Sequence, residues 1–187
     1  DQLLRVWRAE IVVEGLVLSE TDHIALATGL AIKLPEQADQ IVTRQLAQIN
    51  NQDRQRRFDW IRPALSPVPS TRRAFFETLA DEDNRAIESW VLGALDALHH
   101  PVRRDDAEAY ILPSLELLEE IQVTGDIFFP ARWLGATLGS HNTPEAAAVV
   151  REFLAQRPEY NHQLRLKILQ AADPLFRAER LLSLPNF

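Results

Sequence analysis

The helical spacing of apolar residues is the feature that most constrains how this chain can fold. In the segment NRAIESWVLGALDAL, apolar residues recur with the i, i+3, i+4, i+7 spacing of one helix face, at Ile87, Trp90, Val91, Ala94, Leu95 and Leu98. In TPEAAAVVREFLAQRP the same spacing follows Thr143, the expected N-cap, and Pro144, the expected first helical residue. Asn-Gly and Asp-Gly turns and sustained apolar–polar alternation are absent. The sequence therefore predicts an all-α fold.

Turn signals divide the chain into about ten expected helices with short connections. Breaks are expected at Leu34-Pro35, Asn50-Asn51, Ser66–Ser70, Asp81–Asn84, His100–Asp105, Gly125–Pro130, Gly139–Thr143, Arg157–Tyr160 and Asp173-Pro174. Helix starts fall roughly 12–20 residues apart, so helix pairs repeat within the period of about 30–45 residues that is typical of α-solenoids. We therefore favour an irregular HEAT- or armadillo-like α-α superhelix of antiparallel helix pairs. A closed helical bundle is the alternative.

Candidate caps mark several of the expected helix starts. Ser19 precedes Glu20 and Asp22, Asp105 has Glu108 three residues on, and Asp173 stands directly before Pro174. Long linkers and low-complexity tracts are missing, so we expect residues 1–187 to form a single helical domain. The chain begins at Asp1 rather than methionine. We expect it to be the C-terminal fragment of a larger protein.

Composition excludes several classes of function. Cysteine is absent, so neither a disulfide framework nor a thiolate site is available. The net charge of −7 disfavours a surface that follows nucleic-acid phosphates. The longest apolar runs are far too short for a membrane span, so we expect neither a membrane nor a nucleic acid as partner. The compartment is left open between cytoplasm and periplasm.

The stretch LHHPVRRDD concentrates residues that could do chemistry. Neighbouring histidines on a helix point about 100° apart and cannot easily bind one ion, unlike the i, i+4 pair of H-E-x-x-H. We interpret Leu98–His100 as a helix end, Pro101 as its stop and Asp105-Asp106 as the next helix start. Arg103 and Arg104 are expected to lie in solvent. His23, His141 and His162 have no ligand spacing to one another, so no metal site is predicted in this chain.

Three further features are also expected to be structural. Pro113 should kink a helix near Ala109 or stand in the first turn of a new one. The pair Glu119-Glu120 is expected on a charged outer face. Two groups of residues are expected in the core: the apolar residues around Pro113, which are Ile111, Leu112, Leu115, Leu118 and Ile121, and the aromatic residues Phe128, Phe129 and Trp133. Pro130 is expected to begin a helix that ends at Gly139. No G-x-S-x-G, P-loop or G-x-G-x-x-G motif occurs, so we predict no catalytic residue in this chain.

Three runs of sequence, in this order, resemble a known protein family. They are NQDRQRRFDWIRPALSPVPSTRRAFFETLADEDNRAIESWVLGALDALHHP, EAYILPSLELLEEIQVTGDIFFPARWL and LRLKILQAADPLF. Together they cover about residues 50–180, and they resemble the C-terminal helical region of bacterial M1-family zinc aminopeptidases, of the aminopeptidase N and leukotriene A4 hydrolase type. The family's H-E-x-x-H and G-x-M-E-N motifs are absent, and the chain contains no methionine.

The resemblance implies a role without catalysis for this chain. It implies that the catalytic domain and its zinc lie upstream in the same protein, and that this helical domain walls the substrate cavity and helps select and position peptides. Some relatives hold the carboxyl end of the substrate with basic residues of this domain. We therefore hypothesise that arginines on the concave side steer peptide carboxylates, with the candidates Arg54, Arg56, Arg57 and Arg62.

Two other functions remain as alternatives. A free-standing HEAT-like scaffold would bind a protein partner through its groove, and it would have no H-E-x-x-H region upstream in its reading frame. A helical-repeat protein that repairs nucleobases or binds RNA would need a basic groove, which the net charge disfavours.

Overall fold

The computed structural model describes residues 2–182, and in these residues the chain forms helices and no strand. The chain divides into two compact units, Asp1–Phe75 and Phe76–Phe187. The all-α prediction is confirmed. The segments number more than the ten expected, because the region around Pro113 divides into several short helices.

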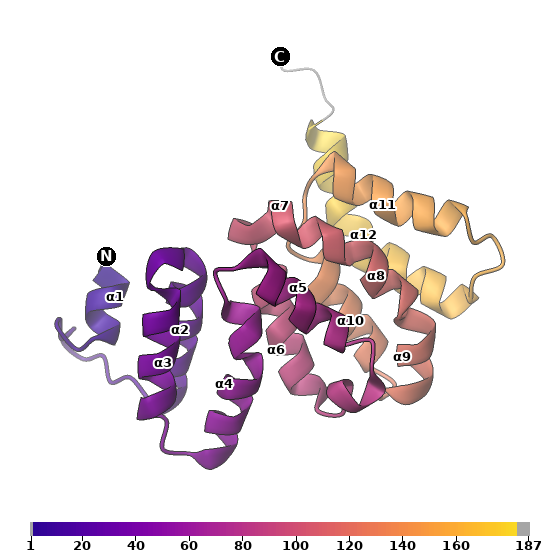
Figure 1. Cartoon of the computed structure of the whole chain (residues 1–187). Coiled ribbons are helices and arrows are strands. Elements are labelled where there is room, and N and C mark those ends of the chain that lie inside the picture. Colours follow the sequence, from indigo (N-terminus) through magenta and orange to yellow (C-terminus); the bar gives the residue numbers. More distant parts are fainter. Residues whose placement is uncertain (1, 183–187) are drawn as a thin grey trace. The chain divides into compact units, whose positions relative to one another are not determined.

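The first unit consists of four α-helices and the beginning of a fifth. They are α1 (Gln2–Trp7), α2 (Glu20–Lys33), α3 (Ala38–Gln48), α4 (Gln52–Leu65) and α5 (Pro69–Thr78), with the 3-10 turn η1 (Pro35–Gln37) between α2 and α3. Figure 1 shows α2, α3 and α4 side by side, and each of these helices contacts the other two. Ser19 forms the predicted capping box at the start of α2, because its hydroxyl and the carboxylate of Asp22 each bind the backbone N–H of the other residue.

The second unit packs around α10. Its α-helices are α6 (Glu88–Leu98), α7 (Arg104–Ala107), α8 (Ile111–Glu116), α9 (Leu118–Thr124), α10 (Phe129–Leu138), α11 (Pro144–Ala155) and α12 (His162–Leu182), and its 3-10 turns are η2 (Glu82–Arg85), η3 (Pro101–Arg103) and η4 (Glu108–Tyr110). Helix α10 contacts α6, α8, α9 and α12 (Figure 1). It can do so because Phe129, Trp133 and Leu134 are fully buried.

Several predicted core positions are confirmed and three are wrong. Ile111, Leu115, Leu118 and Ile121 are buried, as are Phe129 and Trp133. Leu112, Ile87 and Phe128 are exposed, Phe128 by 66%. Each of these three residues lies in the first turn of a helix or just before it, where the chain turns away from the core and the helical spacing no longer decides which side is buried.

One predicted helix start, at Asp173-Pro174, and one predicted cap, Asp105, are wrong for local reasons. Helix α12 continues through Asp173-Pro174, because its buried stripe of Leu164, Ile168, Ala172 and Leu175 runs across the proline. Asp105 is not a cap. The cap lies at His100, whose Nδ1 accepts the Val102 N–H at 3.2 Å, and the η3 turn that follows leads directly into α7. Asp105 and Asp106 stand in the first turn of α7.

The other predicted boundaries agree with the structure. Helix α6 ends at Leu98 with Pro101 after it, Thr143 caps α11 with Pro144 behind it, and Pro113 lies in the first turn of α8. Helix α10 begins at Phe129, one residue before Pro130, and ends before Gly139. Helix pairs with short connections are thus present, such as α2 with α3 and α11 with α12. The superhelix that we expect them to form remains a prediction.

Candidate functional site

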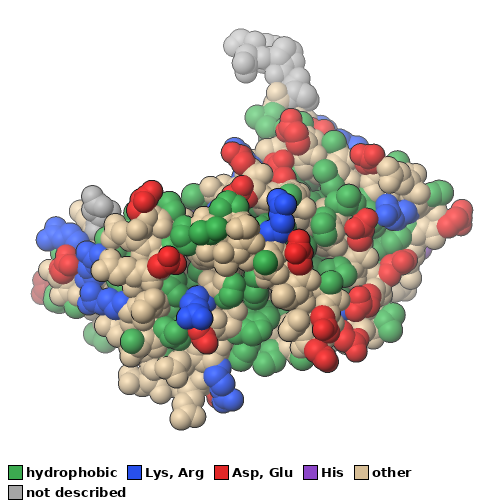
Figure 2. Space-filling model, in the orientation of Figure 1, with side chains coloured by type: hydrophobic (Ala, Val, Ile, Leu, Met, Phe, Trp, Pro, Cys, Tyr) green, Lys and Arg blue, Asp and Glu red, His purple; other side chains and the backbone are tan. Residues whose placement is uncertain are grey.

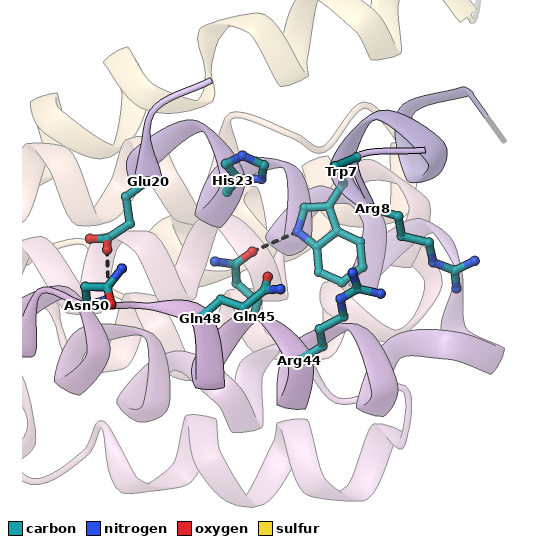
Figure 3. A pocket seen from close by; sticks show the side chains of 9 residues that line it. Trp7, Arg8, Glu20, His23, Arg44, Gln45, Gln48 and Asn50 are labelled. Carbon is teal, nitrogen blue, oxygen red and sulfur yellow. Dashed lines mark hydrogen bonds between the residues drawn. The ribbon is translucent and has the colours of Figure 1, made fainter. Parts of the chain in front are cut away.

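The candidate site is a pocket of about 320 Å³ in the first unit. It lies between the end of α1, the start of α2 and the second half of α3 (Figure 3). Its volume is at the lower end of the range of small-molecule sites. The lining residues are Trp7, Arg8, Ala9, Glu20, His23, Arg44, Gln45, Gln48 and Asn50.

Trp7 and Gln45 form a rigid wall of this pocket. Both side chains are buried, and the Trp7 indole N–H donates to the Gln45 side-chain oxygen at 2.7 Å (Figure 3). The guanidinium of Arg44 lies 5.3 Å from the centre of the Trp7 ring, within the range of a cation–π contact. Because its wall is held by a buried hydrogen bond, the pocket is formed without a ligand.

The charges around the pocket are separated. Figure 3 shows Arg8 and Arg44 beside the indole of Trp7, with Glu20 and Asn50 at the opposite end. Glu20 accepts the Asn50 backbone N–H at 2.8 Å and an N–H of Arg54 at 2.9 Å, and this pairing holds the pKa of Glu20 below its ordinary value. Arg44 pairs with no carboxylate among residues 2–182. Arg8 donates to the Gln37 side-chain oxygen at 3.1 Å and lies 3.9 Å from the Glu10 carboxylate. Arg44 is therefore the guanidinium of the pocket that can bind a carboxylate, while the Glu20 end is already neutralised.

The two units differ in charge. The first has ten basic and nine acidic side chains, and the second has ten basic and eighteen acidic ones. Figure 2 shows acidic and basic side chains interspersed with hydrophobic ones over the face that it presents. The acidic excess of the chain thus belongs to the second unit, so the net charge of −7 does not argue against anion binding in the first unit.

The four predicted arginines lie on the exposed side of α4. Its buried face consists of Phe58, Ile61, Ala64 and Leu65. Arg54 pairs with Glu20, Arg56 with Asp53 at 2.6 Å and Arg62 with Asp59 at 3.4 Å, whereas Arg57 is exposed. Of the four, only Arg54 is bonded to a residue of the pocket. Their role with peptide carboxylates remains a prediction.

The structure separates the two neighbouring histidines and gives one of them a new partner. His99 is 1% exposed, and its Nδ1 lies 2.9 Å from Nε2 of His141, which is 4% exposed. Burial lowers the pKa of His99 to about 3, and it also lowers the pKa of His141. His100 instead caps η3. This pair was not predicted from the sequence, because His141 lies 42 residues from His99 and no local spacing connects them.

The prediction that Arg103 lies in solvent is wrong, and the prediction that Glu120 lies on the outer face is confirmed. Arg103 is buried rather than in solvent, and it donates to the Ala97 carbonyl at 3.3 Å. Glu120 is exposed as predicted, but it also binds the buried guanidinium of Arg85. Arg85 and Arg103 each lie in a 3-10 turn and donate to a carbonyl six residues earlier, near the end of the preceding α-helix, which for Arg85 is that of Leu79. Such pairings depend on the tertiary fold, and sequence spacing does not reveal them.

Residues 2–182 contain no group of three or more His, Asp or Glu side chains arranged to hold a metal ion. The zinc that the family resemblance implies therefore does not fit residues of this part of the chain. No helix in the same range is both long enough and apolar enough to cross a bilayer.

Comparisons with known proteins give no match, whether with family models, curated proteins or solved structures. The structure defines the class as an all-α protein built mostly from short helices. Within this class, the sequence runs and the pocket of the first unit are the features that point to a function.

Proposed function

We propose that this chain is the non-catalytic helical domain of an M1-like zinc aminopeptidase, in which it walls the substrate cavity and helps select and position peptides. The observation that carries this proposal is the order of three sequence runs that resemble the C-terminal region of that family. All three runs fold into packed helices, the first into α4 to α6, the second mainly into α8 to α10 and the third into α12. In this proposal the catalytic domain and its zinc lie upstream.

The pocket of the first unit gives this role a physical basis. A peptide that is held far from the reacting bond can still contribute binding energy to the reaction. Arg44 supplies a guanidinium group over the flat Trp7 ring, and Arg8, which is paired with Glu10, lines the same end of the pocket. Gln48 and Asn50 supply polar groups along the wall. Guanidinium groups bind carboxylates with paired, charge-assisted hydrogen bonds. We therefore place the binding of the peptide carboxyl end beside Trp7 and Arg44, at the end of the pocket opposite the Arg54–Glu20 pair.

The first test of the proposal is the reading frame that encodes this chain. The proposal requires an upstream segment with H-E-x-x-H and a more distant glutamate. A complete reading frame without such a segment would contradict it and would favour the free-standing interaction scaffold.

The second test measures the role of the pocket in the full-length protein. Arg44→Gln should lower kcat/KM roughly 10- to 150-fold for peptides with a free carboxyl end, as expected for a lost charge-assisted hydrogen bond of about 1.5–3 kcal/mol. Arg8→Gln should lower it less, because Arg8 is already paired with Glu10. The same variants should leave peptides with an amidated end nearly unchanged. Arg132→Gln, which removes an exposed arginine paired with Asp126, serves as the control.

The outcome also locates the carboxylate site. If Arg57→Gln or Arg62→Gln removes the preference for the free carboxyl end and the pocket variants do not, the site lies on α4 instead. If no variant changes the preference, this chain does not bind the peptide carboxylate.

A further inference from the structure

The buried pair of His99 and His141 is a feature that the proposed function does not use. His99 caps the end of α6, and His141 lies in the connection between α10 and α11. Their rings are 5.2 Å apart, nearly perpendicular, and linked through nitrogens 2.9 Å apart. The second nitrogen of each ring, Nε2 of His99 and Nδ1 of His141, is buried without a partner. The histidine pair thus joins two segments that are far apart in the sequence, and the exposed Arg104 also donates to the Asn142 side-chain oxygen at 3.0 Å between them.

The buried position of this pair favours two neutral rings. In the hydrogen bond one nitrogen carries the hydrogen and the other offers its lone pair. A proton added to the outer nitrogen of the donating ring would keep this bond, but it would place a cation where water cannot reach it and leave a buried N–H without an acceptor. A proton added to the accepting nitrogen would place two N–H groups face to face. Protonation of either ring is therefore unfavourable while the pair is closed.

The surrounding groups do not compensate a positive charge fully. From the η3–η4 segment, Glu108 favours protonation of His141 and Arg104 opposes it, while Arg103 is turned toward the Ala97 carbonyl. Glu108 is itself engaged by the Thr143 hydroxyl at the start of α11. His99 meets the edge of the Tyr110 ring. On the α6 side, the nearby titratable groups are Asp96, one turn earlier, and His100, which caps η3.

We propose that the His99–His141 pair is an acid-sensitive lock, which joins the end of α6 to the α10–α11 connection when both rings are neutral and releases them when either ring is protonated. The proposal does not depend on the aminopeptidase function, since it rests on residues of the second unit that do not line the pocket. Acidification is the signal, and the released segments are residues 99–104 and 139–143.

The direction of the pH effect follows from the lowered pKa values. We call the arrangement with the two rings bonded the closed state and the arrangement with the rings separated and hydrated the open state. In the open state each imidazole has its ordinary pKa of 6.5, whereas the pKa of His99 in the closed state is about 3. The open state therefore binds more protons below pH 6.5, and closing weakens as the pH falls from there toward 3. From pH 7 to pH 5 the closing equilibrium constant should fall about 25-fold through His99 alone, and up to about 600-fold if His141 also stays neutral.

The test is hydrogen–deuterium exchange at pH 7 and pH 5, corrected for the intrinsic effect of pH on exchange. Opening of residues 99–104 and 139–143 should increase at pH 5, while residues 20–33 of α2 serve as an internal reference. His99→Asn with His141→Gln replaces the two bonded nitrogens by amide groups that do not titrate, and it should abolish the increase. His162→Gln, at an exposed histidine, is the matched control and should behave as the unaltered protein does.

Histidine NMR titration of the unaltered protein keeps the test independent of variants that fail to fold. His99 and His141 should remain neutral down to the pH at which the two segments open. The proposal is overturned if His99 and His141 titrate near 6.5 without any change in exchange. An equal increase in exchange with and without the double substitution overturns it as well.

Discussion

At the scale of single residues, the second unit contains a buried arginine, Arg85, whose charge is neutralised by a glutamate 35 residues away in the sequence. The Arg85 side chain is only 3% exposed, and it binds both the Leu79 carbonyl and Glu120, which is 45% exposed. Removal of one partner of such a pair leaves a buried charge without compensation. Glu120 therefore contributes to stability although its helix position suggests an ordinary surface residue.

We predict that Glu120→Gln lowers the free energy of unfolding by about 1–2 kcal/mol, since the amide keeps a weaker hydrogen bond but loses the charge. The adjacent Glu119→Gln is the matched control, because Glu119 is exposed and forms no ion pair among residues 2–182, and it should change the value by less than about 0.5 kcal/mol. Urea unfolding followed by circular dichroism measures both. Equal effects of the two substitutions would show that the Arg85–Glu120 pair adds nothing.

At the scale of helices, caps formed within a few residues were predictable from the sequence and distant pairings were not. Thr143 caps α11 through the Ala146 N–H at 3.1 Å, as its position before Pro144 predicts. The Trp7–Gln45 and His99–His141 contacts join residues 38 and 42 positions apart, and only the folded chain brings them together. Local chemistry therefore predicted most helix boundaries, whereas the walls of the pocket and the histidine pair required the structure.

Pro174 shows the limit of local signals most clearly. A proline lacks the N–H that a helix needs and normally ends it, so the sequence predicted a break there. Buried Ala172 and Leu175 on either side of the proline hold α12 together, and Asp173 forms an ion pair with Arg177 at 2.8 Å. Packing of a long apolar face outweighs the local cost in this helix.

We predict that Thr143→Ala lowers the free energy of unfolding by about 1 kcal/mol, as is typical for the loss of an N-cap. The hydroxyl also donates to Glu108, so the effect should not be smaller than that of a simple cap. Thr143→Ser keeps the oxygen and should restore most of the loss. The measurement is again equilibrium unfolding, and a serine variant as unstable as the alanine variant would mean that the hydroxyl is not the stabilising group.

At the scale of the whole molecule, the proposed function assigns peptide binding to this chain and catalysis to a domain upstream of it. The first unit is nearly neutral and holds a pocket with guanidinium groups, whereas the second is strongly acidic and packs around α10. The helical class was predictable from the spacing of apolar residues. The pocket was not, because its arginines, Arg8 and Arg44, stand on separate segments outside the three runs that resemble the family.

Hydrolysis of aminoacyl p-nitroanilides by the full-length protein, measured before and after chelation, is the sharpest test of the proposed function. We expect turnover that chelation abolishes and added zinc restores, and no turnover by residues 1–187 alone with zinc present. A full-length protein without aminopeptidase activity, or turnover by residues 1–187 alone, would contradict the proposal that this chain is the non-catalytic domain of an aminopeptidase.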